Sequence, residues 1–143
     1  MARIKIDLPE KFSFTVSIPV RITDVNYGGH VGNDTVLSII HEARMQYLQC
    51  YQFTELNIGG AGLIMRDLLI EFKKEIFYPA FLEVQVAIAN ATSASFEMFY
   101  KLSIHKSVPV ADVAYAKTGM VAYDYTNKKV VPLPENFRAV VIS

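Results

Sequence analysis

Hydrophobic and polar residues alternate along residues 12–22, and this is the first regular pattern in the chain. The apolar positions are Phe12, Phe14, Val16, Ile18, Val20 and Ile22. A period of two is typical of a half-buried β-strand. Pro19 has no backbone N–H to donate, so we expect this strand to lie at a sheet edge or to carry a bulge. Residues 1–11, which precede it, are expected to form a loose lead-in.

A second pattern, with apolar residues three and four positions apart, runs through residues 33–51. Its members are Val36, Ile39, Ile40, Ala43, Tyr47, Cys50 and Tyr51. This spacing predicts an amphipathic helix of about 18 residues that packs on a broad surface. Gly28, Gly29 and Gly32 come before it and permit backbone turns. Asn33 or Asp34 is expected to cap the helix.

The rest of the chain again shows strand patterns, with short polar links between them. The predicted strands cover residues 63–72, 82–88, 95–104 and 110–123. Residues 90–94 and 105–109 are predicted to form hairpins. The fold class is therefore α+β, with a five-stranded antiparallel sheet and one long helix in a single domain over residues 1–143. One helix leaves apolar sheet surface uncovered, which predicts self-association.

Charge and cysteine content narrow the possible partners and compartment. Fourteen basic residues balance fourteen acidic ones, so charge gives no support for nucleic-acid binding. No apolar run approaches the ~20 residues needed to cross a bilayer, so no membrane partner is expected. Cys50 is the single cysteine, so no internal disulfide can form. We expect a cytoplasmic protein.

Two short motifs connect this order of elements to a known family. They are Gly29-His30-Val31-Gly32-Asn33 and Glu42-Ala43-Arg44. Their sequence and separation resemble acyl-CoA thioesterases of the 4-hydroxybenzoyl-CoA thioesterase type. The resemblance implies a hotdog fold, in which an antiparallel five-stranded sheet wraps around one long central helix.

The same resemblance implies hydrolysis of an acyl-CoA or acyl-carrier-protein thioester to a free acid and a thiol. It implies no metal and no cofactor beyond the CoA of the substrate. It also implies a homodimer or homotetramer whose sites are built across a dimer. The small-molecule thioester and a second copy of the chain are thus the expected partners.

The family position that usually holds an acidic nucleophile or base is Asn26, three residues before Gly29. An amide can orient water, but it cannot accept a proton at neutral pH. Asp24 could substitute as the carboxylate, or it could only fix the turn. If the backbone is extended there, Asp24 and Asn26 point the same way.

His30 and Glu42 are the other two candidates for catalysis. His30 could bind the ligand carbonyl or act as a base, or it could anchor the loop. Glu42 lies on the same helix flank as Ser38 and could be the general base. Its other interpretation is a surface or interface glutamate.

The resemblance assigns substrate binding to the loop that precedes the helix. The binding residues would be Gly29, Val31, Gly32 and Asn33, with the backbone N–H of Asn33 as the oxyanion donor. Helix N-termini carry free N–H groups and partial positive charge, which suits that role.

The sequence leaves two other functions open. Asp24-Val25-Asn26 followed by His30 is similar to an element of hotdog dehydratases and hydratases. A non-catalytic acyl-CoA-binding module would also fit, because Asn26 lacks the family's carboxylate.

Overall fold

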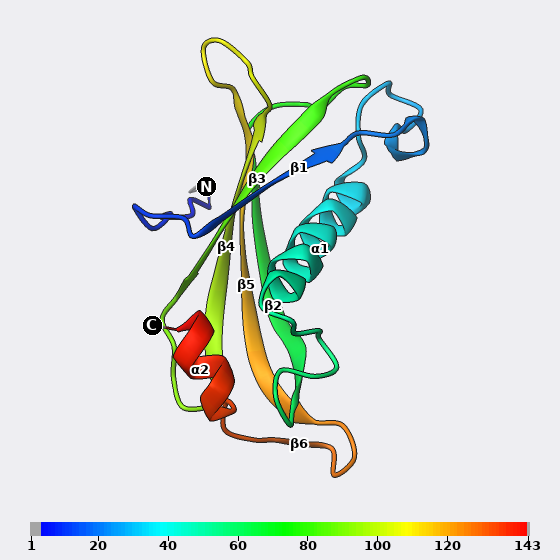
Figure 1. The fold of residues 1–143 in the computed structure, drawn as a ribbon. Coiled ribbons are helices and arrows are strands. Elements are labelled where there is room, and N and C mark those ends of the chain that lie inside the picture. Colours follow the sequence, from blue (N-terminus) through cyan, green and yellow to red (C-terminus); the bar gives the residue numbers. More distant parts are fainter. Residues whose placement is uncertain (1–3, 143) are drawn as a thin grey trace.

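The alternating segment near the N-terminus forms strand β1, Phe14–Pro19, in the computed structural model, which describes residues 4–142. The strands pair in the order β1-β3-β4-β5-β2, all antiparallel, so β1 is an edge strand as Pro19 predicts. The other elements are η1 (Ile22–Asp24), α1 (Asn33–Cys50), β2 (Gly62–Phe72), β3 (Phe81–Ala89), β4 (Ser95–Ile104), β5 (Asp112–Asp124), β6 (Lys129–Val130) and α2 (Glu135–Val141). Figure 1 shows α1 lying against one face of this sheet.

The predicted first strand is too long at both ends. Pro19 is its last residue, and after one more backbone bond, from Val20 N to Ala80 O at 2.8 Å, the chain turns away. Ile22 then falls in the 3-10 helix η1, where it is 66% exposed. Phe12 packs on the opposite sheet face.

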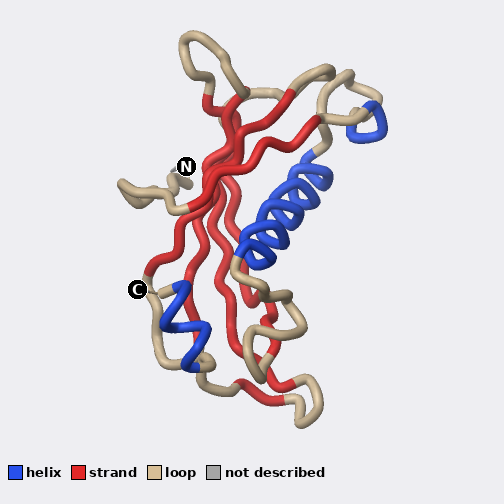
Figure 2. The backbone as a smooth tube through the Cα atoms, viewed as in Figure 1, coloured by secondary structure: helices blue, strands red, loops and turns tan. Residues whose placement is uncertain are grey.

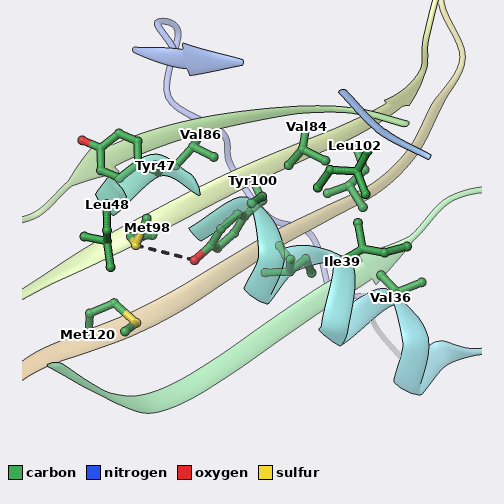
Figure 3. Close-up of a cluster of buried hydrophobic side chains, with 14 of the residues drawn as sticks. Val36, Ile39, Tyr47, Leu48, Val84, Val86, Met98, Tyr100, Leu102 and Met120 are labelled. Carbon is green, nitrogen blue, oxygen red and sulfur yellow. Dashed lines mark hydrogen bonds between the residues drawn. The ribbon is translucent and has the colours of Figure 1, made fainter. Parts of the chain in front are cut away.

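Helix α1 confirms the period-3.6 pattern up to Tyr47, but Cys50 is exposed at the last turn and Tyr51 is the C-cap, so the buried stripe ends before them. Its buried residues are Val36, Ile39, Ile40, Ala43, Arg44, Tyr47 and Leu48. Figure 3 shows several of these packed against side chains from β3 and β4, such as Val84 and Leu102. Alanines 114, 116 and 122 of β5 are fully buried, which keeps the inner face of the sheet flat. The helix comes nearest to β1 and β3.

The opposite sheet face is partly covered by the N-terminal segment. Ile6 is buried against Ala87 and Phe99, and its backbone N–H donates to Glu71 Oε1 at 3.1 Å. The expectation of a loose lead-in is therefore wrong for the described residues 4–11. In Figure 2 this segment runs as an irregular loop on the side of the sheet away from α1.

Two short elements at the C-terminal end were not predicted. Strand β6 has two residues and pairs with β5. In α2, the ring of Phe137 lies 5.3 Å from that of Phe53 and 5.4 Å from that of Phe96, measured between centroids. These rings close one end of the core. No helix within residues 4–142 is long and apolar enough to cross a membrane.

Candidate active site

Residues 25–31 form a tight loop that delivers the chain to the start of α1. An isolated bridge pairs Val25 with Val31, and Asn26 N donates to His30 O at 2.9 Å. Gly29 N donates back to Asn26 O at 3.1 Å, and Gly29 has a φ of +83°. A residue with a Cβ is strained at that φ, so glycine suits this turn.

The Asn26 side chain stabilises the loop and points away from Asp24. Its Oδ1 accepts from Gly28 N at 2.9 Å, which is an Asx turn. Asn26 is exposed whereas Asp24 is buried, so the idea that both point the same way is wrong. The reason is the 3-10 turn at Asp24, which replaces the extended backbone that the prediction assumed.

The Asp24 carboxylate holds the turn that follows β1. Its Oδ2 accepts from the backbone N–H of Arg21 at 2.8 Å, and its Oδ1 lies 3.5 Å from Arg21 Nη2. Asp24 is 7% exposed. These contacts account for a structural role.

His30 is fixed by its own backbone neighbour. Its Nδ1 lies 3.0 Å from Val31 O. Because a carbonyl only accepts hydrogen bonds, we assign the proton of the neutral ring to Nδ1, which leaves a lone pair on Nε2. Nε2 lies 4.0 Å from Glu75 Oε1. A Cβ added at Gly28 would be 3.3 Å from both this Nε2 and Asn26 Oδ1, so the two side chains meet above the glycine.

The start of α1 leaves its first N–H groups without a side-chain cap. The N-cap is Gly32, with φ −69° and ψ 154°, and not Asn33 or Asp34 as expected. Val36 N donates to Gly32 O at 3.1 Å, which begins the helical hydrogen bonding. The N–H groups of the first turn, that of Asn33 included, therefore remain available to an anion.

Two cavities flank the N-terminal half of α1 and separate the predicted site residues. A cavity of about 370 Å³ on the β1 side is lined by Asp24 and Glu42. A cavity of about 220 Å³ on the β2 side is lined by His30, Val31 and Asn33. Neither set of lining residues includes Asn26, Gly29 or Gly32. Glu42 is exposed and accepts a hydrogen bond from Gln46 Nε2 at 2.8 Å.

The sequence reasoning missed a buried polar cluster beneath α1. Arg44 Nε donates to Glu55 Oε1 at 3.2 Å, and Arg44 Nη1 donates to Tyr100 Oη at 3.2 Å. Tyr100 Oη is 2.9 Å from Thr118 Oγ1, and His41 Nε2 is 2.8 Å from Glu55 Oε1. The Glu42-Ala43-Arg44 motif is the one sequence signal that singles out Arg44. Figure 3 shows Tyr100 reaching from β4 toward α1.

Ionisation behaviour in this cluster follows from its burial and its partners. Burial alone lowers the pKa of Arg44, but Tyr100 and Glu55 outweigh it and raise that pKa above its ordinary value. Burial raises the pKa of Tyr100, against the opposing effects of Arg44 and Thr118. The guanidinium therefore stays charged and the phenol stays protonated at neutral pH.

The antiparallel sheet with the long helix α1 against one face defines a hotdog protein of the thioesterase-like class. The thioesterase-like superfamily matches over residues 20–141, and the chain belongs to that family. A comparison with curated protein sequences finds no significant match.

Solved structures agree with this family. The 1,4-dihydroxy-2-naphthoyl-CoA thioesterase from Synechocystis is 25% identical with a TM-score of 0.82, over 91% of this chain and 96% of that one. A thioesterase superfamily protein from Jannaschia sp. CCS1 is 18% identical with a TM-score of 0.80, over 94% and 84%. A DHNA-CoA thioesterase from Staphylococcus aureus is 18% identical with a TM-score of 0.76, over 87% and 83%. The last two similarities bear on the fold alone.

Proposed function

We propose that this protein hydrolyses an acyl-CoA or acyl-carrier-protein thioester in the cavity between α1 and β2. The observation that carries the proposal is the fixed orientation of His30, whose Nδ1 is bound to Val31 O and whose Nε2 stays free as a base. The cavity also contains Asn33, at the uncapped start of α1. A base and an oxyanion site in one cavity are the two groups that thioester hydrolysis needs.

The proposed reaction assigns one role to each group. The N–H groups at the start of α1 bind the carbonyl oxygen as it gains negative charge. A water held between the Asn26 amide and His30 gives its proton to His30 Nε2 as its oxygen bonds to the carbonyl carbon. The tetrahedral intermediate collapses, the carbon–sulfur bond breaks, and the thiolate takes the proton back from the imidazolium. Glu75 Oε1 lies 4.0 Å from Nε2, beside the ring that carries the proton in between.

Hydrolysis of a panel of acyl-CoAs, followed by thiol detection, tests the proposal. His30→Ala is expected to lower kcat by about 100-fold or more, because a general base contributes roughly that much. His105→Ala is the matched control, since His105 lies elsewhere with Nδ1 3.3 Å from Glu83 Oε2. Glu42→Gln is expected to leave kcat within about twofold. Loss of activity in Glu42→Gln with full activity in His30→Ala would assign the base to Glu42 instead.

The family assignment favours hydrolysis over the dehydratase alternative. The binding-module alternative predicts tight acyl-CoA binding with no turnover of any thioester, and that result would refute the enzymatic proposal. Asn26→Asp is informative here. It keeps an oxygen for the Gly28 N–H and restores the carboxylate that the family position usually holds. A rise in kcat in that variant would support the site.

We further propose that the protein assembles as a homodimer through β2. This strand is a long edge in the protomer, with Met65 46% exposed and Phe72 40% exposed. Leu37 on the neighbouring flank of α1 is 39% exposed. A second copy paired along β2 would cover these residues and close the α1–β2 cavities, whereas a free edge of this length invites uncontrolled pairing. The N-terminal segment already covers part of the outer face, which leaves the edge as the better surface.

A further inference from the structure

A second cavity lies on the β2 side of α1, further along the helix than the His30 cavity. It has a volume of about 220 Å³. Its walls are His41 and Arg44 from α1, Met65 and Leu68 from β2, and Thr118 from β5.

The two cavities on this side follow each other between the same two elements. The His30 cavity extends from Asn33 and Val36 on the helix to Phe72 on the strand. The second cavity continues with Leu37 on the helix and with Leu68 on the strand. From the first cavity to the second, the lining residues move toward the C-terminus of α1 and toward the N-terminus of β2. The two cavities therefore lie along one seam between these elements.

Arg44 supplies a hydrogen-bond donor to this deeper cavity. Its Nε and Nη1 are used by Glu55 and Tyr100. Among residues 4–142, Arg44 Nη2 has no hydrogen-bond partner. It is also not fully enclosed by protein atoms. Since Arg44 lines the cavity, we infer that Nη2 faces it. Arg44 is 5% exposed, and a buried guanidinium aimed into a cavity that Met65 and Leu68 also line is well placed to recognise an oxygen atom.

We propose that the two cavities form one acyl channel, and that Arg44 binds an oxygen atom near the far end of the acyl group. This inference rests on the proposed thioesterase function and names its substrate class. The helix rises ~12 Å between Asn33 and His41, and the Arg44 side chain leans back toward the helix N-terminus. An acyl group of medium length, longer than one aromatic ring, reaches that depth.

The charges around the cavity select a neutral oxygen. The guanidinium of Arg44 is compensated by the Glu55 carboxylate, with Nε 3.2 Å from Oε1. The Arg44 and Glu55 charges cancel each other, so a carboxylate on the substrate would bring an uncompensated negative charge. A hydroxyl or keto oxygen can accept from Nη2 without that cost. Hydroxyacyl and ketoacyl thioesters are the substrate class we assign.

The primary test compares decanoyl-CoA with ω-hydroxydecanoyl-CoA on the purified full chain. A hydrogen bond from a charged donor is worth about tenfold in kcat/KM, so the hydroxylated substrate should be preferred by that factor. A keto analogue of equal length distinguishes the two oxygen types. Equal kcat/KM for the oxygenated and plain substrates would overturn the proposal.

Thr118→Val tests whether the buried cluster is the source of this preference. The substitution keeps the shape of the side chain and removes the hydroxyl that lies 2.9 Å from Tyr100 Oη. We expect the preference to fall below about threefold, with a larger loss of kcat/KM for the hydroxylated substrate than for decanoyl-CoA. Thr15→Val, on the exposed face of β1, is the control. If Thr118 had a purely structural role, the substitution would lower kcat/KM equally for both substrates. That result would refute its part in recognition.

Leu68→Phe tests the channel by filling it. We expect hydrolysis of decanoyl-CoA to fall by about tenfold or more and that of butanoyl-CoA to persist, because the short chain ends before Leu68. Leu69→Phe is the matched control, since Leu69 packs on the opposite sheet face against the N-terminal segment. An equal loss for both chain lengths in Leu68→Phe would contradict the channel.

Binding measurements separate a failure of this inference from a failure of the proposed function. Non-hydrolysable thioether analogues of the same two decanoyl substrates can be titrated by calorimetry. If no thioester is hydrolysed, the proposed function fails. Tighter binding of the hydroxylated analogue, lost in Thr118→Val, would still support the subsite. Equal binding of both analogues would overturn it.

Discussion

Replacing Tyr100 by phenylalanine removes a single oxygen atom but should destabilise the fold strongly, because that oxygen connects the helix to the sheet. The Tyr100 side chain is fully buried, and its hydroxyl joins Arg44 on α1 to Thr118 on β5. The hydrogen bond with the charged guanidinium contributes about 2 kcal/mol, and that with the neutral threonine contributes about 1 kcal/mol. The free energy of unfolding is therefore expected to fall by about 3 kcal/mol, equivalent to roughly 10 °C in Tm for a chain of this size.

Urea unfolding at one fixed protein concentration measures this loss and keeps any assembly constant between variants. Tyr115→Phe is the matched control. Its hydroxyl donates to Asp112 Oδ2 at 2.6 Å on a half-buried site, so a loss of about 1 kcal/mol is expected. The double variant Tyr100→Phe/Thr118→Val should recover part of the loss, because it removes the threonine hydroxyl that the single variant leaves unpaired. A loss below about 0.5 kcal/mol in Tyr100→Phe would refute the view that this cluster anchors α1 to the sheet.

Three further predictions concern the turn, the alkaline limit and the assembly. Asp24→Asn should lower the free energy of unfolding by about 1 kcal/mol with kcat unchanged, because Asp24 Oδ2 accepts from Arg21 N at 2.8 Å. A large drop in kcat at unchanged stability would instead place Asp24 in the chemistry. Burial, with Tyr51 beside it, raises the pKa of Tyr47 to about 12. This folded value exceeds the unfolded value of about 10. The contribution of the protonated Tyr47 to the free energy of unfolding is therefore complete below about pH 10 and is lost as the pH rises toward 12. Urea midpoints should therefore fall between about pH 10 and pH 12, and less so in Tyr47→Phe; an identical fall in both proteins would contradict this assignment. Met65→Glu should convert the proposed dimer to a monomer in light scattering, whereas Val140→Glu, at an equal exposure of 46%, should not; a dimer that persists in Met65→Glu would exclude the β2 edge.

Much of the fold was predictable because burial imposes its own periods on the sequence. The helix boundaries and four of the strands follow from apolar residues repeating every 3.6 or two positions. The N-terminal segment escaped this reasoning because it has no regular structure. Ile6 is buried because the segment crosses the sheet at that point. Its backbone N–H donates to Glu71, which lies 65 positions away in the sequence.

The candidate site was predictable only as a stretch of chain. The loop from Asn26 to Asn33 was identified, but the sequence could not show that His30 and Glu42 lie on different flanks of α1. That separation depends on the strand order, which places β1 on one side of the helix and β2 at the opposite sheet edge. The Arg44 cluster was missed for a similar reason, since Tyr100 is 56 residues away and no periodicity links the two.

The two flanks of α1 also differ in how each could become a closed site. On the β1 flank, Asp24 is already engaged with Arg21, and Glu42 with Gln46, so both carboxylates have protein partners. On the β2 flank, His30 Nε2 has Glu75 Oε1 at 4.0 Å but no hydrogen-bond partner in the described part of the chain, and the first N–H groups of α1 have no side-chain cap. That flank also borders the free sheet edge, where a second copy would exclude water from the cavity and strengthen each electrostatic interaction within it. Unused hydrogen-bonding groups and an edge that a partner can close coincide on one flank. This coincidence, more than the identity of any single residue, is our reason for proposing that the chemistry takes place in the seam between α1 and β2.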